Sequence, residues 1–99
     1  MFLQNYLDDF YYNQVVNMYE ADYLNTLDEV NFYKIYKLFE LYEFYYIEDI
    51  ILKYLEIFTM DYKIVNNGIL KLKDKLGDLF VYKIGNDMTY LNEIIKEGI

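Results

Sequence analysis

The sequence predicts an α+β fold with three N-terminal helices, a three-stranded antiparallel β-meander and a C-terminal helix. Apolar residues recur every three or four positions through residues 2–59, as on one face of a helix. After residue 61 the spacing shortens to an alternation that Asn66-Asn67-Gly68 interrupts, and Asn-Gly is the usual centre of a β-hairpin turn. A chain of 99 residues is the size of one domain. We therefore expect a single domain over 1–99, with an acidic helical part (1–60), a sheet (61–84) and a final helix (87–98).

The first helix is predicted over about residues 2–19. Its expected core face consists of Leu3, Leu7, Phe10, Gln14 and Met18. The opposite face carries Asp8, Asp9 and Tyr12, and no lysine precedes Lys34 to neutralise these acids. Residues 20–25 break the helical periodicity.

The second helix is predicted over about residues 27–45. Thr26 and Glu29 have the spacing of a capping box, in which each side chain accepts a hydrogen bond from the other residue's free backbone N–H. The outer face of this helix carries five residues at spacings of 4, 3, 4 and 3, which places them in one line: Glu29, Tyr33, Tyr36, Glu40 and Glu43.

The third helix is predicted over about residues 47–59, with Glu48 and Asp49 at its positive N-terminal end. Its apolar stripe consists of Ile47, Ile50, Ile51, Tyr54, Leu55 and Phe58. Since no glycine or proline separates it from the second helix, one long helix over 27–59 is the alternative. A phase shift of the stripe at residues 44–46 favours a break.

The predicted strands are residues 62–65, 69–73 and 79–84, followed by a helix over 88–97 that Asp87 caps. Leu91, Ile94 and Ile95 form the apolar face of this last helix. Four lysines of the sheet share its solvent side, where charge discourages edge-to-edge aggregation: Lys63, Lys71, Lys73 and Lys83. The alternative is a nucleic-acid face in a winged-helix order, which the net charge of −8 and the lack of arginine oppose.

The composition argues against an enzyme. The chain has no His, Cys, Ser, Arg, Pro or Trp, so it lacks the usual nucleophiles, imidazole bases and thiolate or imidazole metal ligands. Carboxylate-only chemistry needs several acids in one cleft, for which a chain this short has little room. We expect no catalytic residue, no metal and no cofactor.

The charge is concentrated in one half of the chain. Residues 1–62 hold twelve acids and three lysines, a charge of −9, whereas residues 63–99 carry +1. An anionic surface rich in tyrosine favours a partner with a basic surface. The predicted binding residues are Glu29, Tyr33, Tyr36, Glu40, Glu43, Asp8, Asp9 and Tyr12. The plainer alternative is a solvated acidic face, and for Asp49, Lys53 and Glu56 local ion pairing is the favoured explanation.

This profile of small size, unpaired acidity from Asp8 and Asp9 to Glu43, tyrosine bias and missing catalytic types resembles small anti-defence proteins of phages and mobile elements. Among these proteins, it resembles anti-CRISPR proteins and DNA-mimic inhibitors in particular. The resemblance rests on overall profile and no motif. It implies binding to the basic nucleic-acid channel of an effector nuclease, either by occupying the duplex site or by locking a conformation.

The predicted function is therefore a non-enzymatic inhibitor that binds the nucleic-acid-binding surface of a target protein, with no direct contact to nucleic acid. The alternatives are a structural or assembly homodimer that buries Tyr33 and Tyr36, and an antitoxin or immunity protein. Neither a signal peptide nor a run of 18 uncharged apolar residues is present, so we expect a cytoplasmic protein with no membrane partner.

Overall fold

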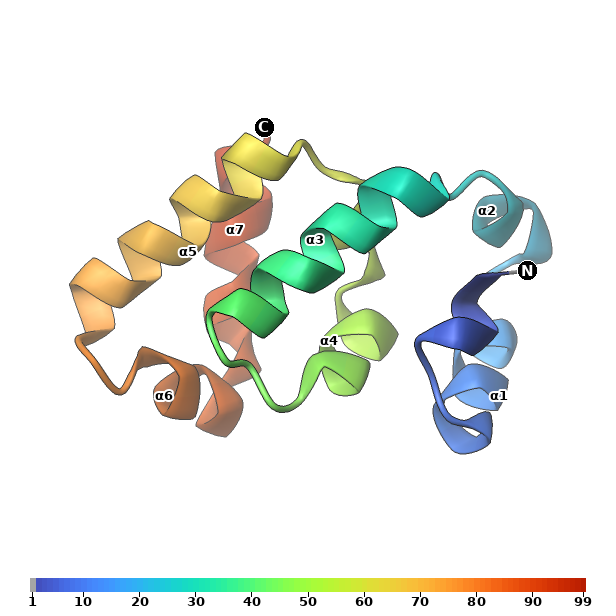
Figure 1. Cartoon of the computed structure of the whole chain (residues 1–99), viewed down its shortest axis with the longest axis horizontal. Coiled ribbons are helices and arrows are strands. Elements are labelled where there is room, and N and C mark those ends of the chain that lie inside the picture. The colour runs from blue at the N-terminus through green and yellow to red at the C-terminus, as the bar shows by residue number, and fades with distance from the viewer. Residues whose placement is uncertain (1) are drawn as a thin grey trace.

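The computed structural model describes residues 2–99 and is helical throughout (Figure 1). The molecule measures 37 × 25 × 20 Å along its principal axes. The α-helices are α1 (Asp9–Met18), α2 (Ala21–Asn25), α3 (Glu29–Leu41), α4 (Ile47–Lys53), α5 (Tyr62–Leu76), α6 (Phe80–Asn86) and α7 (Asn92–Glu97). Three short 3-10 helices accompany them: η1 (Phe2–Asn5), η2 (Leu55–Thr59) and η3 (Met88–Leu91).

The predicted α+β fold is wrong, because helices occupy the region where we expected the meander and residues 2–99 contain no strand. The first two predicted strands and their Asn-Gly turn all lie in the single helix α5. Asp61 caps its start by accepting a hydrogen bond from the Lys63 N–H, and Gly77 ends it with a φ of +84°. The third predicted strand lies largely in α6.

Tertiary packing explains why Asn-Gly does not turn the chain. The buried residues of α5 recur at i, i+3, i+4 and i+7, which is helical spacing: Val65, Gly68, Ile69 and Leu72. Gly68 lies against α7, where an added Cβ would be 3.0 Å from Ile94 Cγ1 and 3.2 Å from Ile94 Cα. The glycine therefore permits close helix packing and does not form a type I′ turn.

The C-terminal helix is confirmed in position, although it begins as a 3-10 turn. Asp87 accepts a hydrogen bond from the Thr89 N–H at 3.2 Å, as the predicted cap requires. Leu91 and Ile94 are fully buried, and Ile95 packs against the core. The chain is helical from Met88 to Glu97 through η3 and α7.

The predicted first helix is two helices, η1 and α1, separated at residues 6–8. Asp8 caps α1 by accepting a hydrogen bond from the Tyr11 N–H at 2.9 Å. The predicted core face is only partly right, since Phe10 and Met18 are exposed and Val15 supplies the buried contact of α1. The short helix α2 occupies the segment where the periodicity breaks.

The break between the second and third helices is confirmed, but α3 is shorter than predicted. Asp28, and not Thr26, caps α3 by accepting a hydrogen bond from the Asn31 N–H at 3.1 Å. The predicted third helix changes at Tyr54 from α4 to η2. Five of its six stripe residues are buried as expected: Ile47, Ile50, Ile51, Leu55 and Phe58.

A chain of phenylalanine contacts runs through the core and connects both halves of the sequence. Phe32 in α3 stacks on Phe58 in η2, with ring centroids 4.7 Å apart, and Phe58 contacts Phe39 at 5.6 Å. Phe39 contacts Phe44 at 5.0 Å, and Phe44 reaches Phe80 in α6 at 5.9 Å. We call these five rings the phenylalanine spine.

Tyrosine hydroxyls fasten helices to one another around this spine. Tyr19 donates a hydrogen bond to the Leu52 carbonyl at 2.9 Å, and Tyr46 donates one to the Val81 carbonyl. Burial raises the pKa of both phenols, for Tyr46 well above the usual range.

No helix within residues 2–99 is long and apolar enough to cross a membrane.

The contact between α5 and α7 predicts that Gly68→Leu destabilises the fold, because a side chain at this position meets the Ile94 backbone. We expect a loss of about 2 kcal/mol in the free energy of unfolding, measured by chemical denaturation. The control is Asn67→Leu at the neighbouring, exposed position, which should change stability by less than about 0.5 kcal/mol. Equal losses in both variants would contradict the close helix contact.

The raised phenol pKa values predict alkaline unfolding. In the unfolded chain tyrosine loses its proton near pH 10, whereas Tyr19, Tyr36 and Tyr46 hold theirs to higher pH in the folded state. Their contribution to stability is therefore complete below about pH 10 and falls as the pH rises through the folded-state values. Part of the tyrosinate absorbance should therefore appear only above pH 10, together with the loss of the helical circular dichroism signal. Full tyrosinate formation near pH 10 without unfolding would contradict this.

Candidate functional site

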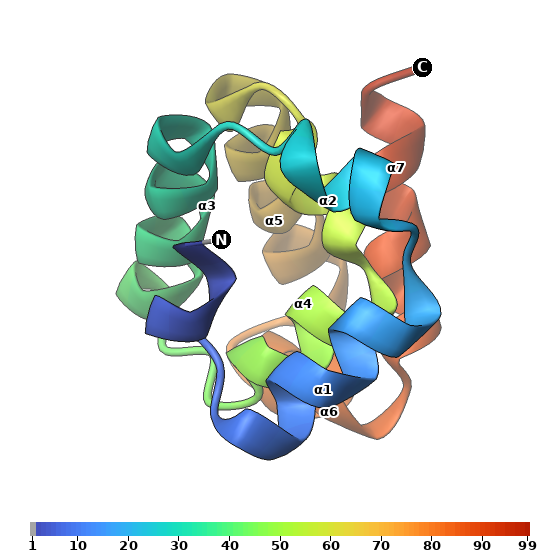
Figure 2. The same ribbon diagram turned by 90° about the vertical axis from the view of Figure 1, so that its right-hand side faces the viewer.

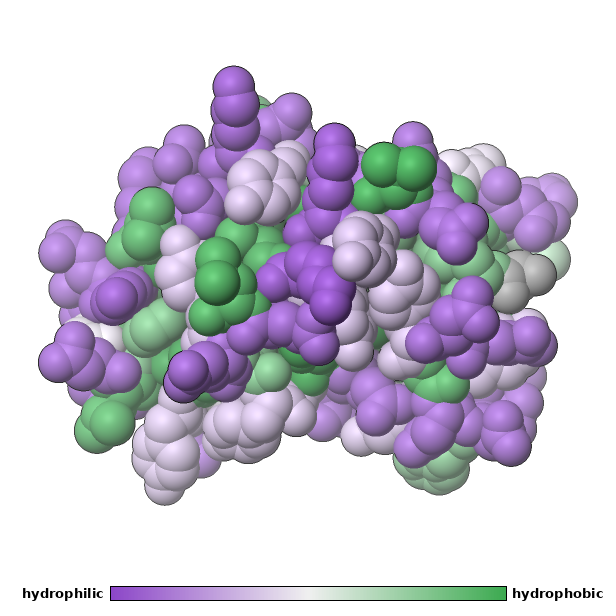
Figure 3. All heavy atoms as spheres, viewed as in Figure 1, coloured by the Kyte–Doolittle hydropathy of each residue, from purple (hydrophilic) through white to green (hydrophobic). Residues whose placement is uncertain are grey.

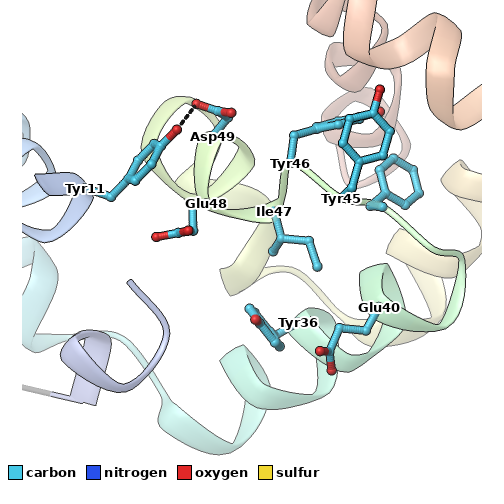
Figure 4. Close-up of a pocket in the computed structure, with 9 residues that line it drawn as sticks. Tyr11, Tyr36, Glu40, Tyr45, Tyr46, Ile47, Glu48 and Asp49 are labelled. Carbon is cyan, nitrogen blue, oxygen red and sulfur yellow. Dashed lines mark hydrogen bonds between the residues drawn. The ribbon is translucent and has the colours of Figure 1, made fainter. Parts of the chain in front are cut away.

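An acidic groove of about 400 Å³ lies between α3 and α4 and reaches α1 at one side. Figure 4 shows Tyr11, Glu48 and Asp49 at that side and Tyr36 and Glu40 across from them. The groove is lined by Tyr11, Tyr36, Glu40, Phe44, Tyr45, Tyr46, Ile47, Glu48 and Asp49. Three carboxylates and four phenols therefore surround one open space.

Two carboxylates of α4 hold α1 in place and so form one wall of the groove. Glu48 Oε2 accepts a hydrogen bond from the Asp8 N–H at 2.9 Å, just before α1 begins. Asp49 Oδ1 accepts one from the Tyr11 hydroxyl at 2.8 Å, and this bond raises the pKa of Tyr11. Figures 1 and 2 both place α1 beside α4. Each carboxylate uses one oxygen in these bonds, and no donor of residues 2–99 binds the other.

The opposite wall belongs to α3. Tyr36 is half-buried with its ring 4.9 Å from that of Tyr6, and burial raises the pKa of its phenol. Glu40 is exposed and forms an ion pair with Lys37 at 2.9 Å. Exposed pairs of this kind contribute little to stability. Another cation can therefore replace Lys37 at the Glu40 carboxylate at little cost in free energy.

The predicted acidic line is shorter in the structure than in the sequence. Glu29, Tyr33, Tyr36 and Glu40 lie in α3, and only the last two reach the acidic groove. Lys37 Nζ lies 5.6 Å from the centre of the Tyr33 ring, a cation–π distance. Glu43 lies beyond the end of α3 and lines a different groove.

Glu43 ends α3 in a Schellman motif, with a glutamate where glycine is usual. Its φ is +65°, the Glu43 N–H donates to the Glu40 carbonyl at 2.9 Å, and the Phe44 N–H donates to the Phe39 carbonyl at 3.0 Å. Phe39 and Phe44 make the hydrophobic contact of the motif. The turn therefore has both hydrogen bonds and the hydrophobic contact of the motif, but the left-handed conformation strains the backbone of Glu43.

The predicted residues of α1 have separate positions. Asp8 is the cap of α1, and Asp9 is exposed in its first turn. Tyr12 is half-buried and packs against the core, so part of its ring is unavailable to a partner. None of the three lines the acidic groove, although Asp8 borders it through Glu48.

Sequence reasoning missed the α1–α4 side of the groove. Asp49 was assigned to local ion pairing with Lys53, but among residues 2–99 its partner is the Tyr11 hydroxyl and no Asp49–Lys53 ion pair forms. The sequence predicts Tyr45 in the apolar stripe of the second helix, and both Tyr45 and Tyr46 lie where the phase of the stripe shifts. A signal was present, since three consecutive aromatic residues, 44–46, are separated by one isoleucine from two acids at the start of α4.

The lysines predicted to share a sheet face have other environments. Lys71 pairs with Glu97 at 2.8 Å, and Lys83 donates to the Leu76 carbonyl at 2.8 Å. Lys73 lies 6.0 Å from the Phe80 ring centre, at the far end of α5 from Lys63. The winged-helix alternative is wrong in its fold, because the segment predicted to form its hairpin is the helix α5.

Comparison of the chain with models of protein families, with curated proteins and with solved structures found no match.

The strain at Glu43 predicts that Glu43→Gly stabilises the protein. Glycine adopts a left-handed φ without the Cβ clash, so we expect a gain of about 1 kcal/mol in the free energy of unfolding. Urea denaturation measures it, with Glu40→Gly inside α3 as the control that should lose about 1 kcal/mol. A destabilised Glu43→Gly variant would show that the glutamate side chain contributes more than its backbone costs.

Proposed function

We propose that the protein is a non-enzymatic inhibitor that binds the basic, nucleic-acid-binding surface of another protein through the acidic groove. The observation that supports this most is the joining of three carboxylates with four tyrosines around an open space of about 400 Å³. A space of this size admits arginine or lysine side chains. Carboxylates pair with their charge, and tyrosine rings bind cations through their faces.

The charge distribution supports the same partner. Residues 1–62 carry −9, and the single ion pair within residues 2–62 is Lys37–Glu40. An unneutralised field of this kind accelerates encounter with basic proteins and disfavours acidic ones, nucleic acid included. Tyr33 and Glu29 extend the surface along α3 beyond the groove.

The target class follows from the resemblance to anti-defence proteins and remains part of the proposal. A CRISPR effector or another defence nuclease presents a basic channel for its duplex, and a protein that blocks it acts in the cytoplasm of the host cell. An antitoxin or immunity protein binds a basic enzyme by the same physics. The identity of the nuclease that is inhibited separates these two possibilities.

The groove allows a test that removes charge without removing structure. In the triple variant Glu40→Gln, Glu48→Gln, Asp49→Asn, amide oxygens still accept the bonds from the Asp8 N–H and the Tyr11 hydroxyl. We expect its affinity for an oligoarginine peptide, measured by calorimetry, to fall roughly ten- to a hundredfold. Binding of the wild-type protein should also weaken between about 0.1 and 1 M salt, where the screening length falls from about 10 to 3 Å.

The matched control changes the same number of charges at exposed positions outside the groove: Glu20→Gln, Asp22→Asn and Asp74→Asn. It should keep the wild-type affinity within about threefold, because distant exposed charges are screened. Equal losses in the two triple variants would show that net charge, and not the groove, binds the peptide. Inhibition of purified CRISPR effectors and other defence nucleases by the wild-type protein then tests the target class.

A further inference from the structure

A second groove, lined by apolar and aromatic side chains with three charged residues among them, lies where the end of α3 meets the turn between α5 and α6. Its volume is about 440 Å³, and we call it the apolar groove. Four large side chains along it are unusually exposed: Leu41 and Tyr45 at 72%, Leu79 at 65% and Tyr82 at 58%. In Figure 3, hydrophobic and near-neutral side chains gather over this part of the molecule. No segment of residues 2–99 covers these side chains.

The apolar area is large enough to form the centre of an interface between two copies. A whole aromatic side chain offers about 150–250 Å², so the exposed parts of Tyr45 and Tyr82 present roughly 200–300 Å². With Leu41 and Leu79 the total is on the order of 500 Å². A standard interface buries about 800 Å² on each partner, of which about 500 Å² is apolar.

The charges in the apolar groove favour a second copy of this chain over an acidic or a basic partner. Lys73, Glu43 and Asp78 all line the groove, so it contains both signs. A two-fold axis makes each surface face itself, and mixed charges allow the lysine of one copy to approach an acid of the other. A groove of one sign would repel its own copy.

The position of the groove also limits repulsion between two molecules that each carry −8. α1 and α2, with their unpaired acids, lie at one end of the long axis, and α5 and α6 lie at the other (Figure 1). That axis is 37 Å long, well beyond the screening length of about 10 Å at 0.1 M salt. Copies that meet at the α5–α6 end keep their most acidic ends apart.

We propose that the protein forms a two-fold symmetric homodimer through the apolar groove. This face differs from the one expected from the sequence, which centred on Tyr33 and Tyr36, since Tyr36 packs on Tyr6 of its own chain. Tyr45 lines both the apolar groove and the acidic groove. Dimerisation therefore orders one wall of each acidic groove and presents two such grooves to a partner.

Sedimentation equilibrium tests the dimer without any partner protein, so its outcome is independent of the proposed function. As the protein concentration rises to about 0.5 mM, we expect the measured mass to approach twice 12.2 kDa. Leu79→Asp and Tyr82→Asp each place like charges near the two-fold axis and should weaken dimerisation at least about tenfold. Because both side chains are exposed, circular dichroism should show an unchanged fold.

The matched control is Phe10→Asp, which adds the same charge at a residue of similar exposure, 68%, outside both grooves. It should dimerise like the wild type. Salt gives a second readout that separates the two grooves: because the acidic ends of the two copies lie apart, added salt should change dimerisation much less than it weakens binding at the acidic groove. A wild-type monomer at every concentration, or a dimer that Leu79→Asp and Tyr82→Asp leave intact, overturns the proposal.

Discussion

The stacking of Phe32 on Phe58 is the contact on which most of the structure depends. It joins α3 to η2 at a ring distance of 4.7 Å, and the Asn31 amide strengthens the same joint by donating to the Phe58 and Met60 carbonyls. From this contact the phenylalanine spine continues to Phe80 in the C-terminal half. Both grooves lie beside the spine, and Phe44 lines the acidic one. The rings of the phenylalanine spine are buried, so the groove walls that pack against the spine are rigidly supported.

The N-terminal helices could be predicted because their buried residues repeat at helical spacing, as Ile47, Ile50 and Ile51 do. The α5 region could not, because Asn67-Gly68 is a strong local turn signal that a long-range contact overrides. Only the position of Ile94 shows that Gly68 is there to let α7 approach. A local propensity of about 1 kcal/mol is smaller than the gain from burying the face of a 15-residue helix.

The candidate site shows the same division between local and long-range information. The sequence places Tyr36 and Glu40 on one face of a helix, since that depends on spacing alone. It does not show that Glu48 and Asp49 face them, because this depends on how α4 docks against α1. The sequence favours local pairing of Asp49 with Lys53, four residues away, yet Asp49 accepts its hydrogen bond from a residue 38 positions distant. At Asp49, a lysine four residues away in the sequence therefore does not identify the partner, whereas at Glu40 the nearby Lys37 does.

The attachment of α1 has a consequence for how the acidic groove moves. Val15 is the one fully buried residue of α1, while Tyr11, Tyr12 and Val16 pack on the core only in part. Hydrogen bonds from α1 and its flanking residues to Glu48, Asp49 and the Leu52 carbonyl add to this attachment. Segments held by few apolar contacts open locally at lower free energy than the core does. The α1 wall is therefore expected to open at a lower free energy than the α3 wall, whose Phe32 and Phe39 belong to the phenylalanine spine. Of the two walls of the acidic groove, the α1 wall is thus the one expected to open first, and to do so without global unfolding.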